Sequence, residues 1–154
     1  LLSLLFAVST PVSPAEVPVQ TLSAERIVAF LRVLAGAWGG QATVTPVGPR
    51  PYDMTFTRTA AGHLEGAAHP GASTHVWTFY EDEQTLKLRF LSTFAGNRQP
   101  LLLTATAEHE GALVFHTQPP PVLEVHVKPL ISTLDIRIFL RHKPHVDIHL
   151  TRVP

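Results

Sequence analysis

Most of the chain after residue 40 consists of short apolar and β-branched runs, each ended by turn-forming residues. The runs are rich in Val, Leu, Ile, Thr and Phe, a composition typical of strands. They lie at residues 40–47, 51–59, 63–69, 74–81, 85–94, 101–108, 112–118, 122–128, 131–141 and 145–152. The segments between them, such as VGPRP and AGNRQP, favour turns. Because a parallel crossover needs about a dozen residues, the pattern predicts an antiparallel meander of about ten strands.

Side chains alternate along these runs, which predicts the face of each strand that points inward. In the run 85–94, Leu86, Leu88 and Phe90 share one face, while Lys87 and Arg89 take the other. The same alternation places one apolar row on Leu134, Ile136, Ile138, Leu140, Val146, Ile148 and Leu150. Closing the sheet into a barrel covers this face and removes the exposed edges. We therefore predict an all-β, up-and-down antiparallel barrel; a two-sheet sandwich is the alternative.

One segment before the strands has the signals of a helix. Ser23 is a suitable N-cap, Glu25 lies in the first turn, and Gly36 is a suitable C-terminal stop. Between them an apolar stripe with helical spacing is formed by Ile27, Phe30, Leu31 and Leu34. The pattern predicts one N-terminal helix that packs a single face against the barrel.

The N-terminus resembles a targeting segment. An apolar run, Leu1 to Val8, is followed by Ser13-Pro14-Ala15, which has the small-x-small pattern of a signal-peptidase site. We interpret 1–15 as a probable signal peptide, 16–22 as a Pro-rich spacer and 23–154 as one barrel domain; a buried N-terminal strand is the alternative. The run is shorter than the roughly 20 residues of a membrane span, and a lipoprotein cysteine is absent. These features predict a secreted or periplasmic protein.

Composition and motifs narrow the function classes. The 12 Lys and Arg residues balance 12 Asp and Glu residues, without the basic stripe that nucleic-acid binding needs. The absence of cysteine removes disulfides, thiolate catalysis and zinc–thiolate sites. The chain also lacks a G-x-S-x-G elbow, a phosphate-binding loop and a dinucleotide fingerprint. The sequence therefore does not indicate an enzyme, and it leaves the oligomeric state open.

A short motif links the helix to the first strand. Gly36-Ala37-Trp38 resembles the G-x-W motif of the lipocalin and calycin superfamily. The longer pattern Gly36-x-Trp38-x-Gly40, followed by about ten strands, is most similar to nitrobindin-type barrels, which have a further glycine where this chain has Ala42. The resemblance covers roughly residues 34–153. It implies a lipocalin-like barrel that binds a small apolar or amphipathic ligand.

The same resemblance suggests a contact between the two ends of the barrel sequence. Lipocalins typically lay an arginine from the end of the barrel across this tryptophan. Arg152 has the parity of Ile148 and Leu150, so it belongs to the inward row. We expect Arg152 to lie over Trp38 and to close that end of the barrel; an arginine that leaves a strand terminus for solvent is the alternative.

In nitrobindin-type proteins a late histidine ligates haem iron, and this chain offers His126, His142, His145 and His149 in that region. By parity His126 points outward, as do His145 and His149 on either side of Asp147, which we interpret as a solvated polar face rather than a metal site. His142 has the parity of the inward row, which makes it the candidate haem ligand. We expect no cofactor, and haem remains an alternative.

A ligand site is predicted from the inward parity of aromatic side chains. The expected lining residues are Phe56, Trp77, Phe79, Phe90 and Phe115, with His75 at the rim as a polar anchor. The same five rings would instead fill the interior if no cavity exists. An enzyme of this architecture, with His75 or His142 as acid–base, is the other functional alternative.

Overall fold

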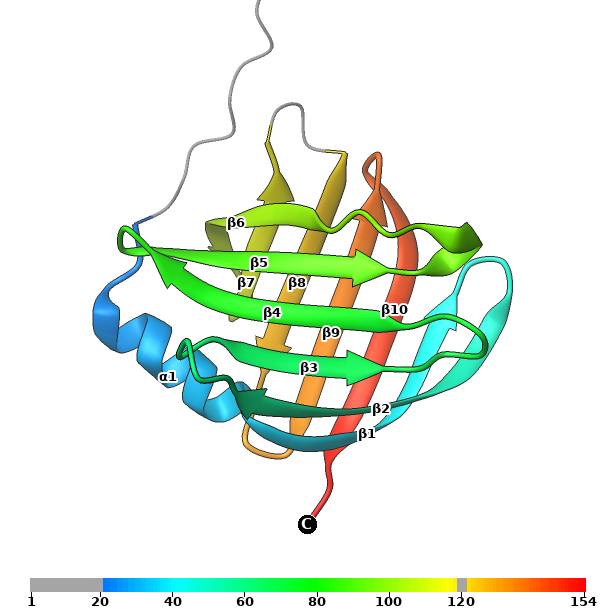
Figure 1. The fold of residues 1–154 in the computed structure, drawn as a ribbon, viewed down its shortest axis with the longest axis horizontal. Helices are drawn as coiled ribbons and strands as arrows, with labels where there is room; N and C mark the ends of the chain where they lie inside the picture. The colour runs from blue at the N-terminus through cyan, green and yellow to red at the C-terminus, as the bar shows by residue number, and fades with distance from the viewer. Residues whose placement is uncertain (1–20, 119–121) are drawn as a thin grey trace, which may run out of the picture.

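The computed structural model describes residues 21–118 and 122–154, which form a closed antiparallel barrel of ten strands (Figure 1). Each strand pairs with its neighbours in the sequence, and β1 pairs with β10 to close the barrel. The elements are α1 (Ala24–Leu34), β1 (Gly36–Val44), β2 (Gly48–Arg58), β3 (Leu64–Ala68), β4 (His75–Asp82), β5 (Thr85–Ser92), η1 (Phe94–Gly96), β6 (Leu101–His109), β7 (Ala112–Thr117), β8 (Leu123–Pro129), β9 (Thr133–Leu140) and β10 (Lys143–Arg152). The predicted barrel is therefore confirmed, and the sandwich is excluded.

Strand bounds agree with the sequence to within a few residues, and the largest difference is in β1. The strand begins at Gly36 instead of residue 40, so Trp38 lies inside it and only Ala35 separates it from α1. The predicted signal peptide (1–15) and most of the predicted spacer (16–22) lie outside the described residues. Secretion consequently stays a prediction.

The barrel interior is one continuous apolar core built from the inward rows of the strands. Leu86 and Leu88 on β5 are completely buried, as are Leu134 and Ile136 on β9. Lys87 and Arg89 of β5 lie on the opposite face, as the alternation predicts. This alternation is what gives the sheet one face to cover and makes closure favourable.

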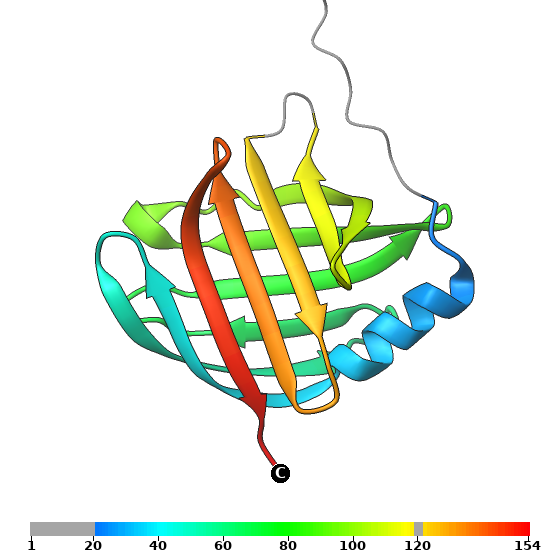
Figure 2. The same ribbon diagram turned by 180° about the vertical axis from the view of Figure 1, so that it is seen from behind.

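Helix α1 lies against one end of the barrel (Figures 1 and 2). Its N-cap is Ser23, whose hydroxyl accepts a 3.2 Å hydrogen bond from the Arg26 backbone N–H. The Arg26 side chain forms a 2.8 Å ion pair with Glu108 near the end of β6. Among the described residues, no helix is long and apolar enough to cross a membrane.

The antiparallel order gives the barrel two ends with different connections. The end beside α1, called here the helix end, carries the connections after β2, β4, β6 and β8. The opposite end, called here the mouth, carries the connections after β1, β3, β5, β7 and β9 (Figure 2).

Candidate functional site

At the helix end, Arg152 lies over the indole of Trp38. The guanidinium carbon is 4.1 Å from the ring centroid, and the two residues are register partners in β10 and β1. The contact expected from the sequence is therefore present. Arg152 also donates hydrogen bonds to the carbonyls of Ile131 (2.7 Å), Ala35 (2.9 Å) and Val33 (2.5 Å). One side chain thus ties the last strand to Trp38, to the end of α1 and to the connection after β8.

These hydrogen bonds satisfy the C-terminal carbonyls of α1, which have no partner within the helix. The Trp38 indole N–H donates to the Leu34 carbonyl at 2.8 Å, beside the two carbonyls that Arg152 binds. A cation at a helix C-terminus is also favoured by the helix dipole. The pair is therefore a structural junction, and its polar groups are occupied by the protein itself.

The glycines on either side of Trp38 are required by close approaches. Gly36 has a φ of 113°, and a Cβ there would lie 2.8 Å from the Arg152 guanidinium. At Gly40 a Cβ would lie 2.3 Å from the backbone oxygen of His149 on the paired strand β10. The Gly36-x-Trp38-x-Gly40 pattern is thus explained by the passage of β1 between α1 and β10.

Aromatic rings fill the half of the interior next to α1. Phe30 enters from the helix and lies 5.6 Å from Phe79 and 6.3 Å from Phe115, measured between ring centroids. Phe79 is also 5.7 Å from Phe115 and 5.9 Å from Phe56. All four side chains are at most 2% exposed. Three of the five predicted lining residues therefore pack on one another and on the helix, as an ordinary core does.

The other two predicted lining residues, Trp77 and Phe90, lie closer to the mouth and accompany the one histidine of the inward row. Their ring centroids are 4.3 Å apart, and His75 lies 5.5 Å from Phe90. The indole N–H of Trp77 donates to the Tyr52 hydroxyl at 2.9 Å. The Tyr52 hydroxyl is in turn 3.0 Å from Nδ1 of His75. Residues of β2 and β4 thus build a hydrogen-bonded chain, and Phe90 of β5 packs against its two β4 members.

Burial and the donor and acceptor groups of Trp77, Tyr52 and His75 determine the protonation of these side chains. Burial lowers the pKa of His75 to about 4, so its ring is neutral at pH 7. Burial raises the pKa of the Tyr52 hydroxyl, and the hydrogen bond from Trp77 offsets this only in part, so the phenol keeps its proton. The phenol oxygen accepts from Trp77 and its O–H is available to donate to Nδ1 of His75, and we infer that it does so.

In this arrangement His75 carries its proton on Nε2. Within residues 21–118 and 122–154, Nε2 of His75 has no hydrogen-bond partner, and the ring is partly buried at the start of β4. A neutral N–H donor is available at the mouth end of the apolar interior. Ligation of iron by Nε2 would require its proton to move to Nδ1 and the hydrogen bond with Tyr52 to reverse direction.

Tyr52 is the member of this chain that the sequence prediction missed. It has the same parity as Phe56 on β2, so its inward position could have been inferred. Its hydrogen bond to His75 depends on how β2, β3 and β4 follow one another, and no sequence motif signals that relation.

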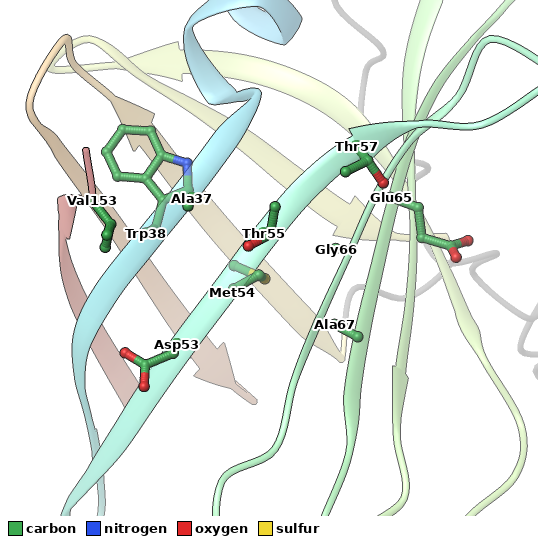
Figure 3. A pocket seen from close by; sticks show the side chains of 10 residues that line it. All are labelled: Ala37, Trp38, Asp53, Met54, Thr55, Thr57, Glu65, Gly66, Ala67 and Val153. Atoms are coloured by element: carbon green, nitrogen blue, oxygen red, sulfur yellow. The ribbon is translucent and has the colours of Figure 1, made fainter.

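The described part of the structure has hollows on the outer side of the barrel, and the two considered below are not lined by the predicted aromatic residues. The first, about 730 Å³, opens on the outer side of β1 to β3. Figure 3 shows Asp53, Thr55 and Thr57 following β2 there, with Glu65 on the neighbouring strand. The small side chains of Ala37 and Ala67 in its lining leave space between the larger neighbouring side chains. Asp53 is exposed, Glu65 is half-buried and accepts a 3.2 Å hydrogen bond from Thr78, and the lining contains no basic side chain, so we assign it no chemistry.

The second hollow, about 580 Å³, lies on the outer side of β7 to β10 and is lined partly by histidines and carboxylates. Its imidazoles already have acidic partners, because Nδ1 of His149 is 2.5 Å from Asp135 and Nε2 of His126 contacts Glu124. Glu124 also accepts from His116 at 2.8 Å. Although burial acts to raise its pKa, these two hydrogen bonds hold the pKa of Glu124 below its usual range. Among the described residues, no group of three or more potential ligands is arranged to hold a metal ion.

The inward placement predicted for His142 is wrong. His142 lies in the two-residue turn between β9 and β10, is exposed and has a φ of 64°. The inward row stops at Leu140, because Arg141 and His142 both adopt positive φ, as tight hairpin turns require. His145 is partly buried, whereas Asp147 and His149 are exposed on the outer face, as the alternation predicts.

Models of known protein families do not match this sequence, and none of the curated proteins matches it at a significant level. The closed ten-strand antiparallel barrel is compatible with a lipocalin- or calycin-like fold.

Proposed function

We propose that the barrel binds a small amphipathic molecule at its mouth, with His75 as the polar anchor. The observation that carries the proposal is the Trp77–Tyr52–His75 chain, which leaves one neutral N–H donor at the mouth end of an apolar interior. Few, precisely placed polar groups within an apolar wall are typical of small-molecule sites. A ligand would place a carbonyl or carboxylate oxygen on Nε2 and its apolar part against Phe90.

Residues near the helix end are not part of this proposed site. Phe56, Phe79 and Phe115 are occupied by one another and by Phe30, so a ligand would not extend to α1. Trp77 and Phe90 supply the floor, and the ligand would be short or would leave its tail in the mouth. We therefore place the ligand in the mouth half of the barrel alone.

The resemblance to nitrobindin-type barrels motivates haem as an alternative ligand, and the geometry argues against the histidines considered for it. His142 is in an exposed turn, and His126 and His149 are paired with carboxylates on the outer face. His145 lies on the opposite face of β10 from the buried Val146. Addition of haemin to the purified protein tests the alternative. We expect no shifted Soret band with the spectrum of a histidine-ligated iron, and such a band would favour haem.

The proposed function is tested by titrating decanoate and oleate into the full chain and following tryptophan fluorescence, since Trp77 lies beside the proposed site. The His75→Leu variant removes the donor, and His75→Gln supplies an amide N–H in its place. We expect His75→Leu to weaken binding about tenfold, the value of one hydrogen bond, and His75→Gln to recover part of the loss. His69→Leu, at an exposed position in the connection after β3, is the matched control.

Absence of saturable binding of either fatty acid by the wild-type protein would contradict the proposal. An equal affinity of wild type and His75→Leu would also contradict it, because the ligand would then not use Nε2.

A further inference from the structure

The mouth is surrounded by apolar side chains that face solvent. Among the described residues, six of the ten large hydrophobic side chains that are exposed lie there. Phe94 is the most exposed aromatic residue, at 72%, and is presented by the one-turn helix η1. The six are Val47, Phe94, Leu101, Leu102, Val122 and Leu140. They come from four connections and the strand ends beside them, so they surround the opening instead of forming one stripe on the wall.

Charge is also distributed unevenly between the two ends. The mouth connections contain Arg98 and Arg141 and no Asp or Glu. The adjoining strand ends add Arg50 and Lys143, and their one carboxylate, Glu124, is paired with two histidines. The strand ends and connections at the helix end carry both signs, with Glu81, Asp82, Glu83, Glu108 and Glu110 beside Arg58, Lys128 and Arg152. The mouth thus has an excess of basic residues, and the opposite end does not.

We propose that the mouth docks on the surface of an anionic lipid bilayer. Apolar side chains such as Phe94 and Leu102 would enter the boundary between headgroups and acyl chains, while Arg98, Arg141 and Lys143 would contact the headgroup phosphates. Exposed apolar groups with an excess of basic residues are the combination that binds such surfaces. The proposal concerns the rim alone and stands whether or not His75 binds a ligand.

A second copy of the chain is a poorer occupant of this surface. In a two-fold dimer the same patch meets itself, so the basic residues of one mouth would face those of the other. The cost of that repulsion has no counterpart on an anionic membrane, where each basic residue contributes attraction.

Sedimentation of the full chain with vesicles tests the proposal. The vesicles contain phosphatidylcholine alone or mixed with phosphatidylserine. We expect the protein to sediment with the mixed vesicles, to bind phosphatidylcholine at least tenfold more weakly, and to be released by added salt. Arg98→Glu combined with Lys143→Glu should lower the affinity at least about tenfold, and Phe94→Ser should lower it about fivefold or more.

Matched variants at the helix end separate docking by the mouth from non-specific adsorption. Ile131→Ser removes an 85% exposed apolar side chain, and Arg58→Glu reverses an exposed charge. Both should sediment like wild type, as should His75→Leu, because it leaves the rim intact. An equal effect of Ile131→Ser and Phe94→Ser would overturn the proposal, as would equal binding to both vesicle types. Dimerisation that Phe94→Ser abolishes, without vesicle binding, would assign the rim to a second copy instead.

Discussion

The two ends of the barrel differ in whether their polar groups are hydrogen-bonded and their apolar side chains buried within the protein. At the helix end Arg152 and Trp38 bind the last carbonyls of α1, and Phe30 fills the interior beneath them. At the mouth, His75 is only partly buried, and apolar side chains such as Phe94 face solvent. The difference teaches that stability and recognition are divided along the barrel axis. Substitutions at the helix end should therefore affect folding, and those at the mouth should affect binding.

The largest expected effect is that of Phe30→Ala. It removes a ring that is 1% exposed and contacts both Phe79 and Phe115, which leaves a cavity under the helix. We expect the free energy of unfolding to fall by about 3–5 kcal/mol, measured by urea denaturation. The control is Val28→Ala on the exposed face of α1, which should cost less than about 1 kcal/mol. A similar loss in both variants would show that α1 does not close the barrel.

Arg152→Met should have the next largest effect. It keeps much of the side-chain volume but removes three hydrogen bonds and the contact with Trp38. We expect about 2–4 kcal/mol of destabilisation in the same assay, because two carbonyls at the end of α1 lose their partner. Arg137→Met, at an exposed residue paired with Asp147, should change stability by less than about 1 kcal/mol. A neutral Arg152→Met would contradict the structural role assigned to the pair.

At the mouth, His75 should make stability depend on pH in a defined window. Because its pKa is lowered to about 4, against about 6.5 in the unfolded chain, the unfolded state binds more protons between these values. Stability should therefore fall as the pH drops from about 6.5 towards 4. Urea denaturation at pH 7 and pH 5 should show a smaller loss for His75→Gln than for wild type. An identical pH dependence of the two proteins would mean that His75 titrates normally.

Phe94→Ser should have the smallest effect on folding. The ring is 72% exposed, so its removal should change the free energy of unfolding by less than about 0.5 kcal/mol. Thermal and urea denaturation both measure this. A loss comparable with that of Phe30→Ala would mean that Phe94 is part of the core and that the mouth is packed like the helix end.

The sequence contained enough information for the fold and for one end of the barrel. The alternation of apolar and polar residues predicts which side chains point into the barrel. The G-x-W motif, together with an inward-facing Arg152 at the end of the last strand, predicts the contact between Trp38 and Arg152. The alternation was less informative where strands end. Extending the alternation of β9 beyond Leu140 predicts an inward-facing His142, but the strand ends at Leu140 and His142 lies in a turn with positive φ.

The hydrogen-bonded chain at the mouth was only partly accessible from sequence. His75, Trp77 and Phe90 were identified by parity, which depends on each strand separately. The role of Tyr52 depends on its hydrogen bond to His75, which lies on another strand. Whether the two side chains meet depends on the strand register, and the sequence of the connections 59–63 and 69–74 does not predict that register. The proton on Nε2 follows from that contact and from burial, which are both tertiary properties.

The protonation state of His75 is the most direct test of this division between the ends. Nitrogen-15 NMR of the histidine side chains, with His75→Gln used for assignment, reports which ring nitrogen carries the proton. We predict a neutral ring protonated on Nε2 that remains neutral at pH 5, with the Nε2 resonance shifting when decanoate is added. A ring protonated on Nδ1, or one that titrates near pH 6.5, would contradict the account.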